Sequence, residues 1–249
     1  MLEDFFKKLN IKEKDYILFT GNLTRLLYKL KGNARENLNS FLDIFLKQTS
    51  RGGGLAIQSF NWDFCKGLSY DILNSKSQTG ALANIALKRA EFKRTKHPIY
   101  SFMVANNFQK DLIELDNKGA FDKNSPFDFM YKNKAKMIIV DLPLQDSFTF
   151  VHYVEQCLRV SYRYNKSFTS FYIDEKGHKE LKTYDMFVRA NNVLTHIHPL
   201  EDLFLQEKVM KIVFFDEIFI KIIDLEKAYK AISKDIEQNQ GLSLHILKA

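Results

Sequence analysis

The sequence predicts an α/β fold, and three of its features support this prediction. Asp15–Thr20 is a short apolar run closed by a turn, as in a buried strand, and Leu55–Phe60 repeats the pattern. Apolar residues at helical spacing separate these two segments, so a helical crossover would make the strands parallel. Tyr162–Val188 alternates between polar and apolar residues, as antiparallel strands do. We therefore expect one domain over residues 1–249, with an antiparallel annex.

The first quarter of the chain supplies the crossover. Leu2–Leu9 predicts a short amphipathic helix before the first strand, and Gly21-Asn22 predicts a turn after it. Apolar residues three and four apart predict helices over Leu23–Lys31 and Asn33–Lys47. Gly52-Gly53-Gly54 ends this pattern. Because these glycines precede a strand and do not open a helix, they indicate a turn and not a phosphate cradle.

The remaining elements follow from the same two periodicities. In chain order they are a helix from Thr79-Gly80 to Ala90, strands at Tyr100–Ala105 and Met137–Val140, a helix around His152, a hairpin turning at Lys176-Gly177, a helix at Pro199–Glu207, strand material over Val209–Ile223 and a helix at Leu225–Ile236.

The composition limits the classes of protein to be considered. Hydrophobic residues make up 45% of the chain, which is enough for a packed core. The chain has no run of eighteen apolar residues and no signal-like start, so we expect a cytoplasmic protein without a membrane span. Only Cys65 and Cys157 are present, so we expect no structural disulfide.

The net charge of +7 favours an anionic partner. Nucleic acid, a phosphate-bearing cofactor and a nucleotide-linked substrate all fit that description. The basic residues are spread among acids, which argues for a solvated surface and against a nucleic-acid stripe. The sequence also lacks the P-loop, GxGxxG and GxSxG fingerprints.

His152 and Glu155 are the strongest candidates for chemistry. Their spacing of three places an imidazole and a carboxylate on one face of the predicted helix. A carboxylate beside an imidazole can orient the ring and stabilise its protonated form, as a general base requires. Taken alone, the spacing also fits a solvated surface pair.

Other polar positions have structural alternatives. The small hydroxyl residues of Ser77–Gly80 precede a helix, so they could cap it or bind an anion. Pro98 holds His97 in an extended backbone, where this histidine could be structural. His196 and His198 are too few to hold zinc, and we expect no metal site.

Several short motifs occur in an order that resembles the antibiotic N-acetyltransferase family, which comprises the aminoglycoside 3-N-acetyltransferases and their relatives. The resemblance covers nearly the whole chain. The matching segments are Phe19–Leu26, Gly53–Phe64, Ser77-Gln78-Thr79-Gly80-Ala81-Leu82, Lys93–Ser101 with its His97-Pro98, Phe121–Phe127, and the Thr-x-x-His-x-x-Glu of Thr149–Glu155.

The resemblance implies a three-layer α/β/α fold with a central mixed sheet. It also implies acyl transfer from acetyl-CoA or another acyl-CoA to a primary amine, with His152 as general base and Glu155 beside it. The residues implied to lie along CoA are Thr20, Gly21, Asn22, Leu23, Thr24, Arg25, Ser77, Thr79 and Gly80; those implied to contact the acceptor are Asn61, Asp63 and His97.

The chain departs from the resistance enzymes of the family in three places. Its first turn is Thr20-Gly21-Asn22 where the family has His and Ser, Gln78 replaces an arginine, and Val140–Pro143 replaces a glycine-rich stretch. These departures bear on the CoA contacts more than on the chemistry.

The acceptor is inferred from charge. Aminoglycosides are polycations, so an enzyme that binds them should be acidic, whereas this chain is basic. We therefore expect a nucleotide-linked amino sugar for surface glycan synthesis, with an aminoglycoside as the alternative. Two further hypotheses are a nucleic-acid-binding module and a catalytically inactive relative. We expect no nucleic-acid or membrane partner. The oligomeric state stays open, with a homodimer as one option.

Overall fold

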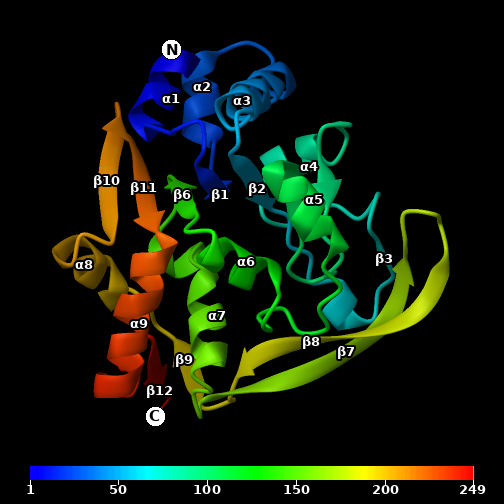
Figure 1. The fold of residues 1–249 in the computed structure, drawn as a ribbon, viewed down its shortest axis with the longest axis vertical. Helices are drawn as coiled ribbons and strands as arrows, with labels where there is room; N and C mark the ends of the chain where they lie inside the picture. The colour runs from blue at the N-terminus through cyan, green and yellow to red at the C-terminus, as the bar shows by residue number, and fades with distance from the viewer. Residues whose placement is uncertain (249) are drawn as a thin grey trace.

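The structure, a computed structural model that describes residues 1–248, is built on a seven-stranded mixed sheet (Figure 1). The strand order is β10-β11-β6-β1-β2-β5-β4. These strands are β1 (Tyr16–Gly21), β2 (Gly54–Gln58), β4 (Lys93–Arg94), β5 (Phe102–Asn106), β6 (Lys136–Val140), β10 (Met210–Phe215) and β11 (Ile218–Asp224). β1 runs parallel to β2 and β6, and the other pairs are antiparallel. The predicted α/β fold and its parallel crossover are confirmed.

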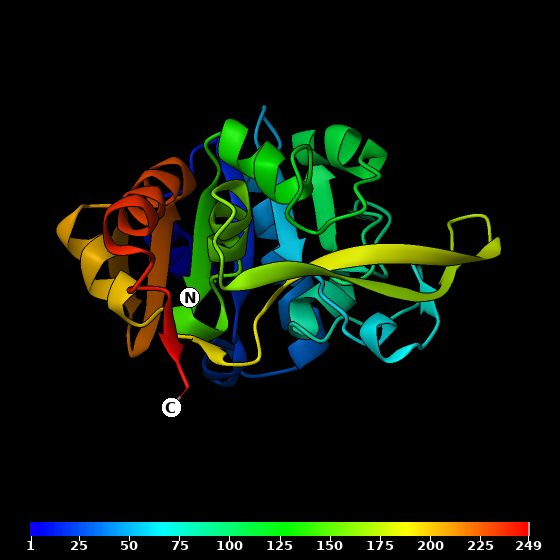
Figure 2. The ribbon, with the colours of Figure 1, turned by 90° about the horizontal axis from the view of Figure 1, so that it is seen from below.

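Helices cover both faces of this sheet, which gives the three layers (Figure 2). The central strands β1 and β2 are almost continuously buried, as strands covered on both faces must be. One layer contains α1 (Leu2–Leu9), α2 (Thr24–Leu30), α3 (Ala34–Gln48) and α4 (Ala81–Ala86); the other contains α5 (Asn107–Glu114), α6 (Pro126–Lys132), α7 (Phe150–Cys157), α8 (Pro199–Gln206) and α9 (Leu225–Asn239).

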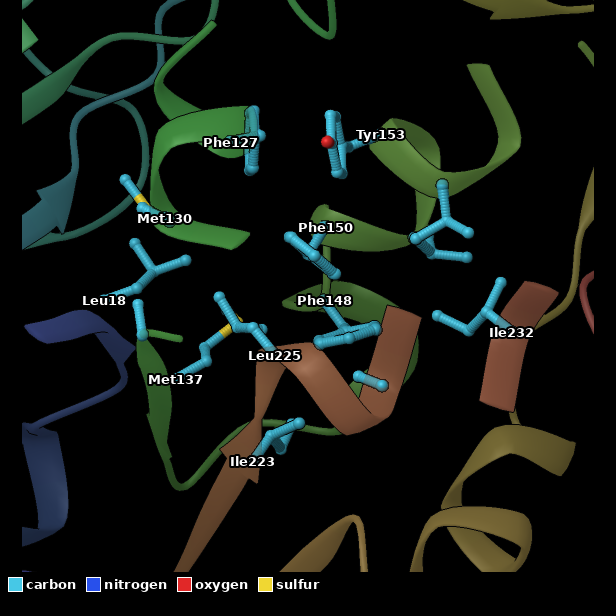
Figure 3. Close-up of a cluster of buried hydrophobic side chains, with 14 of the residues drawn as sticks. Leu18, Phe127, Met130, Met137, Phe148, Phe150, Tyr153, Ile223, Leu225 and Ile232 are labelled. Atoms are coloured by element: carbon cyan, nitrogen blue, oxygen red, sulfur yellow. The ribbon is translucent and has the colours of Figure 1, made fainter. Parts of the chain in front are cut away.

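The second layer fixes α7, which carries the His152–Glu155 motif. Phe150 and Tyr153 of α7 point into a buried cluster between the sheet and the helices (Figure 3). Both side chains are almost fully buried. The same cluster includes Leu18 and Met137 from the sheet, Phe127 and Met130 from α6, and Leu225 and Ile232 from α9. Packing therefore fixes most of α7 in place, and His152 remains partly exposed on it.

A long hairpin, here called the arm, extends beyond the sheet and consists of β7 (Arg163–Ile173) and β8 (Lys179–Arg189) (Figure 1). It is the predicted antiparallel annex. The short strand β3 (Tyr70–Asp71) pairs with β7, and a small cluster of aromatic and aliphatic side chains holds the arm to the body. The remaining short elements are η1 (Phe64–Lys66), η2 (Leu144–Asp146), and β9 (Val193–Thr195) paired with β12 (His245–Leu247).

The structure differs from the prediction in the length of one helix, in the division of one predicted stretch of strand material, and in two helices that were not predicted. The helix expected to continue to Ala90 ends at Ala86, because the amides of Lys88 and Arg89 bond to the carbonyls three residues back and tighten the last turn. The apolar stretch Val209–Ile223 folds as two strands, since Asp216 adopts a positive φ of 50° and turns the chain between them. Helices α5 and α6 were not predicted. Within residues 1–248, no helix is both long and apolar enough to cross a membrane.

Candidate active site

The centre of the candidate site is the pair formed by His152 and Glu155 on α7. Their positions three residues apart place both side chains on one helix face, and His152 Nδ1 lies 2.6 Å from Glu155 Oε2. The Glu155 side chain is fully buried, whereas the ring of His152 is 18% exposed. A buried carboxylate held against a partly exposed imidazole does not fit the alternative of a solvated surface pair.

The contact defines which ring nitrogen is available for chemistry. An ionised carboxylate only accepts hydrogen bonds, so Nδ1 carries the proton and Nε2 keeps its lone pair. Burial lowers the pKa of His152 below its usual value of 6.5, and the nearby charge of Arg163 lowers it further, although Glu155 opposes both effects. His152 is therefore neutral at pH 7 and can accept a proton.

Arg163 at the start of β7 is a functional neighbour that the sequence did not reveal. Its Nε lies 2.7 Å from Glu155 Oε2, the oxygen that also faces His152. Burial alone would raise the pKa of Glu155, but His152 and Arg163 together outweigh burial and lower it. The only signal for Arg163 was a charge near the start of an alternating segment, which is common at strand ends.

A cavity of about 530 Å³ opens beside His152, between α7 and the base of the arm. Tyr100 and His152 line it together with side chains of β7 and β8. The charged residues that line it are all basic, and among the described lining residues none is Asp or Glu. They are Arg163, Lys166, Arg189 and Lys248.

A second cavity, of about 480 Å³, forms a groove at the carboxyl ends of β1 and β2. In α/β sheets, ligands commonly bind at this edge. Seven of the nine residues predicted to lie along CoA line the groove. They are Thr20, Gly21, Asn22, Leu23, Thr24, Thr79 and Gly80.

The turn after β1 needs the residues it has. A Cβ on Gly21 would lie 2.8 Å from the Cβ of Val140, so only glycine fits there. The Asn22 amide donates to the Val140 carbonyl at 2.9 Å, and the Asn22 side chain accepts from the Thr24 amide at 3.0 Å. These bonds fix the turn against the end of β6 and shape one wall of the groove.

The Ser77–Gly80 segment forms the opposite wall. The hydroxyl of Thr79 donates to the Gln58 carbonyl at 3.0 Å and accepts from the Phe60 amide at 3.1 Å. This joins the segment to the end of β2. Ser77 itself does not line the groove, and its hydroxyl instead accepts from the Thr79 amide at 3.1 Å.

A family model described as aminoglycoside 3-N-acetyltransferase matches residues 47–237 of this chain. The chain belongs to this family. The resemblance inferred from the motifs is thereby confirmed, as are the expected N-acyltransferase class and acyl-CoA co-substrate. No curated protein shows significant sequence similarity to the chain.

Solved structures of aminoglycoside acetyltransferases share the fold. AAC-IIIb in a binary complex with CoASH superposes with a TM-score of 0.81 at 12% identity, covering 96% of this chain and 95% of that one. Aminoglycoside acetyltransferase AAC(3)-Xa gives 0.77 at 13% identity, covering 95% of this chain and 91% of that chain. YokD from Bacillus subtilis gives 0.76 at 16% identity, with coverages of 97% and 93%.

Within this family fold, Arg25 lies outside the groove despite its predicted role. Its guanidinium forms a two-pronged ion pair with Asp141 and donates to the Glu217 carbonyl at 3.2 Å. The Asp141 carboxylate is almost fully buried. Arg25 therefore joins α2 to the end of β6 and to the turn between β10 and β11, and it can act on the groove only through that position.

The three residues predicted to contact the acceptor line neither cavity. Asn61 is buried, and its side chain donates to the Lys76 carbonyl, beyond β3, at 2.9 Å. Asp63 forms an ion pair with Lys66 at 3.0 Å. Neither side chain is among the described residues that line the cavity beside His152.

His97 is 2% exposed and serves as a packing and hydrogen-bonding residue. Its Nδ1 accepts from the Tyr100 amide at 3.2 Å, and its ring packs against Tyr184. Burial lowers the pKa of His97 to about 4. His97 thus positions the loop that carries Tyr100 to the cavity wall. Among residues 1–248, no group of three or more His, Cys, Asp or Glu side chains could hold a metal ion.

Proposed function

We propose that this protein transfers an acyl group from acyl-CoA to a primary amine of a sugar, with His152 as the general base. The observation that carries the proposal is the buried Glu155 carboxylate, 2.6 Å from Nδ1 of an imidazole that borders a cavity. Because the pKa of His152 is lowered, the ring is ready to accept a proton at neutral pH. No enzyme nucleophile is needed.

In this mechanism, the amine nitrogen attacks the thioester carbonyl carbon and forms the C–N bond. Nε2 of His152 takes the amine proton, and Glu155 stabilises the resulting imidazolium. The carbonyl oxygen becomes an oxyanion, which backbone amides at a turn could hold. The C–S bond then breaks, the carbonyl re-forms, and the imidazolium proton passes to the departing thiolate to give free CoA.

The groove at the ends of β1 and β2 is the proposed CoA site. The Thr20–Thr24 turn and the Thr79–Gly80 segment line it. The aromatic ring of Phe60 packs between Trp62 of the groove and Tyr100 of the cavity, with ring centroids 6.3 and 4.9 Å away. In this arrangement the acyl group would reach His152 past these aromatic side chains.

The proposed acceptor is a nucleotide-linked amino sugar. The cavity beside His152 is lined by Lys166, Arg189 and Lys248 besides Arg163, whose charge Glu155 balances, and among its described lining residues there is no carboxylate. Such a surface favours the phosphates of a nucleotide sugar and disfavours a polycation. The amine of the sugar would then face His152 while the phosphates lie toward the arm.

An aminoglycoside is the second candidate acceptor. It is favoured by the family description and by the names of structural relatives such as aminoglycoside acetyltransferase AAC(3)-Xa. AAC(3)-Xa, for example, shares 13% sequence identity with this chain. At this level of identity, the acceptor preference can change while the fold stays constant.

The test is an acceptor screen that detects free CoA. Acetyl-CoA and longer acyl-CoAs would be offered with UDP- and dTDP-linked amino sugars and with kanamycin-type aminoglycosides. We expect kcat/KM for a nucleotide-linked sugar to exceed that for every aminoglycoside. A higher kcat/KM for an aminoglycoside would reverse the choice of acceptor. If no amine in the screen caused release of CoA, the proposed reaction would be contradicted.

A further inference from the structure

Arg163 makes a contact that no other cation of the cavity makes. A single oxygen, Glu155 Oε2, lies 2.6 Å from His152 Nδ1 and 2.7 Å from Arg163 Nε. The side chains of Arg163 and Glu155 are 5% and 0% exposed. A buried carboxylate is thus shared between a permanently charged guanidinium and an imidazole that can titrate.

We propose that Arg163 is a positioning residue for the acyl transfer: it keeps Glu155 ionised and fixed against Nδ1, and it keeps the imidazole uncharged until the amine proton arrives. This inference rests on the proposed function of the same site. A buried carboxylate with no cationic partner would take up a proton or would itself charge the imidazole. With Arg163 present, the positive guanidinium already offsets the negative charge of Glu155. The buried site therefore carries no net charge when the imidazole of His152 is neutral.

Arg163 also connects this pair to the walls of the acceptor cavity. Its Nη1 donates to the Phe187 carbonyl of β8 at 3.3 Å, and its Nη2 donates to the Thr195 hydroxyl of β9 at 2.9 Å. Phe187 and Thr195 both line the cavity. One guanidinium therefore fixes the position of the base relative to the surface that would hold the acceptor.

The other titratable groups near His152 cannot replace Arg163. Burial raises the pKa of Tyr100 to about 12 and also raises the pKa of Tyr162, so both phenols stay neutral. The remaining cations, Lys166, Arg189 and Lys248, line the cavity without an ion pair to Glu155 in the described residues. Arg189 instead donates to the Val193 carbonyl at 2.7 Å. This makes Arg189 a matched control of equal charge.

The experiment follows the His152 ring by NMR titration in the substrate-free protein. His152→Gln identifies its signal among the six histidines. In Arg163→Gln we expect the pKa of His152 to rise by roughly one unit or more, since a cation in contact with a buried site typically shifts a pKa by that amount. Arg163→Lys should keep the lowered value, and Arg189→Gln should raise it by less than half as much.

The same comparison is made in the enzyme's activity. The acidic limb of the plot of kcat/KM against pH should shift to higher pH in Arg163→Gln. In Arg163→Lys it should return toward the wild-type position. A folded Arg163→Gln protein with an unmoved His152 pKa would overturn the inference, even if its activity fell. Loss of CoA release in the wild type with every acceptor would instead contradict the proposed function, because the titration requires no turnover.

A second comparison covers the case in which Arg163→Gln does not fold. In Glu155→Gln the buried site keeps the guanidinium, whereas Glu155→Gln/Arg163→Gln carries two neutral amides. We expect a lower pKa for His152 in the single variant than in the double variant. Equal values in the two proteins would show that Arg163 does not act on the imidazole.

Discussion

At the scale of single residues, His152 is the group on which the proposed reaction depends. Its Nε2 is available because Nδ1 faces Glu155, and His152 does not line the groove proposed to bind CoA. We therefore expect His152→Ala to lower kcat by at least ~10²-fold, the range typical of a general base, while CoASH binds as before. Steady-state kinetics and calorimetric titration with CoASH check both parts. Near-normal turnover in the folded variant would exclude the role.

Glu155 acts through His152 in this mechanism, so its loss should cost less. We expect Glu155→Gln to lower kcat less than His152→Ala does, and we expect the double variant to be no slower than His152→Ala alone. Residues that work as one unit give non-additive losses. A double-mutant cycle on kcat/KM measures this, and additive losses would mean that the two side chains act separately.

His97 illustrates how a candidate site residue can be structural. Its pKa is about 4 in the fold, against an ordinary value of 6.5, so the unfolded chain takes up its proton first as pH falls. The stability contributed by neutral His97 is present above pH 6.5 and is lost as pH falls toward 4. We expect this residue alone to cost roughly 2 kcal/mol between pH 6.5 and 5.

Urea unfolding at pH 7.5 and pH 5 tests this expectation. His97→Phe should unfold with a smaller difference in free energy between the two pH values than the wild type. Exposed His178 provides the matched control, since His178→Phe changes a histidine outside the core. An unchanged pH difference in His97→Phe would contradict the assignment.

At the scale of secondary structure, the strands around the groove could be predicted because apolar runs such as those of β1, β2 and β6 have few alternatives in a sheet covered on both faces. Helix α5 was missed because it begins directly after β5, where Asn106 adopts a φ of 56° and turns the chain without a loop.

Arg163 was missed because its partner is nearby in space and on another element, which a single sequence does not record. Asn61 and Asp63 were assigned from the motif alone, which does not record that Asn61 bonds to the Lys76 carbonyl or that Asp63 pairs with Lys66.

The groove offers a prediction at this scale. The Thr79 hydroxyl joins the Ser77–Gly80 segment to Gln58 and Phe60, so Thr79→Val should loosen one wall of the groove. We expect CoASH to bind roughly tenfold more weakly, in line with the loss of a part-buried hydrogen bond pair. Thr169→Val on the exposed face of the arm is the control, since the Thr169 hydroxyl bonds to the Thr183 hydroxyl at 2.8 Å, far from the groove lining. Equal affinities of the two variants would argue against this groove as the CoA site.

At the scale of the whole molecule, the net charge of +7 and the four cations of the cavity both favour an anionic acceptor. The family fold by itself does not choose between a polycationic and an anionic acceptor, because both are amines that one base could deprotonate. What separates them is the sign of the field at the cavity mouth, where Lys166, Arg189 and Lys248 lie. Charge at this location acts on binding and association more than on the chemical step.

This field is tested by salt and by charge removal together. For a nucleotide-linked amino sugar, we expect KM to rise when salt is raised from low to physiological ionic strength, because screening weakens attraction between exposed charges. Lys166→Gln and Arg189→Gln should each raise that KM several-fold and flatten its salt dependence, with kcat changed little. Lys211→Gln on β10, exposed and outside the cavity, is the control. If the two cavity variants instead lower KM for an aminoglycoside that the wild type already acetylates well, the cavity's charge opposes the true substrate and the aminoglycoside is the acceptor.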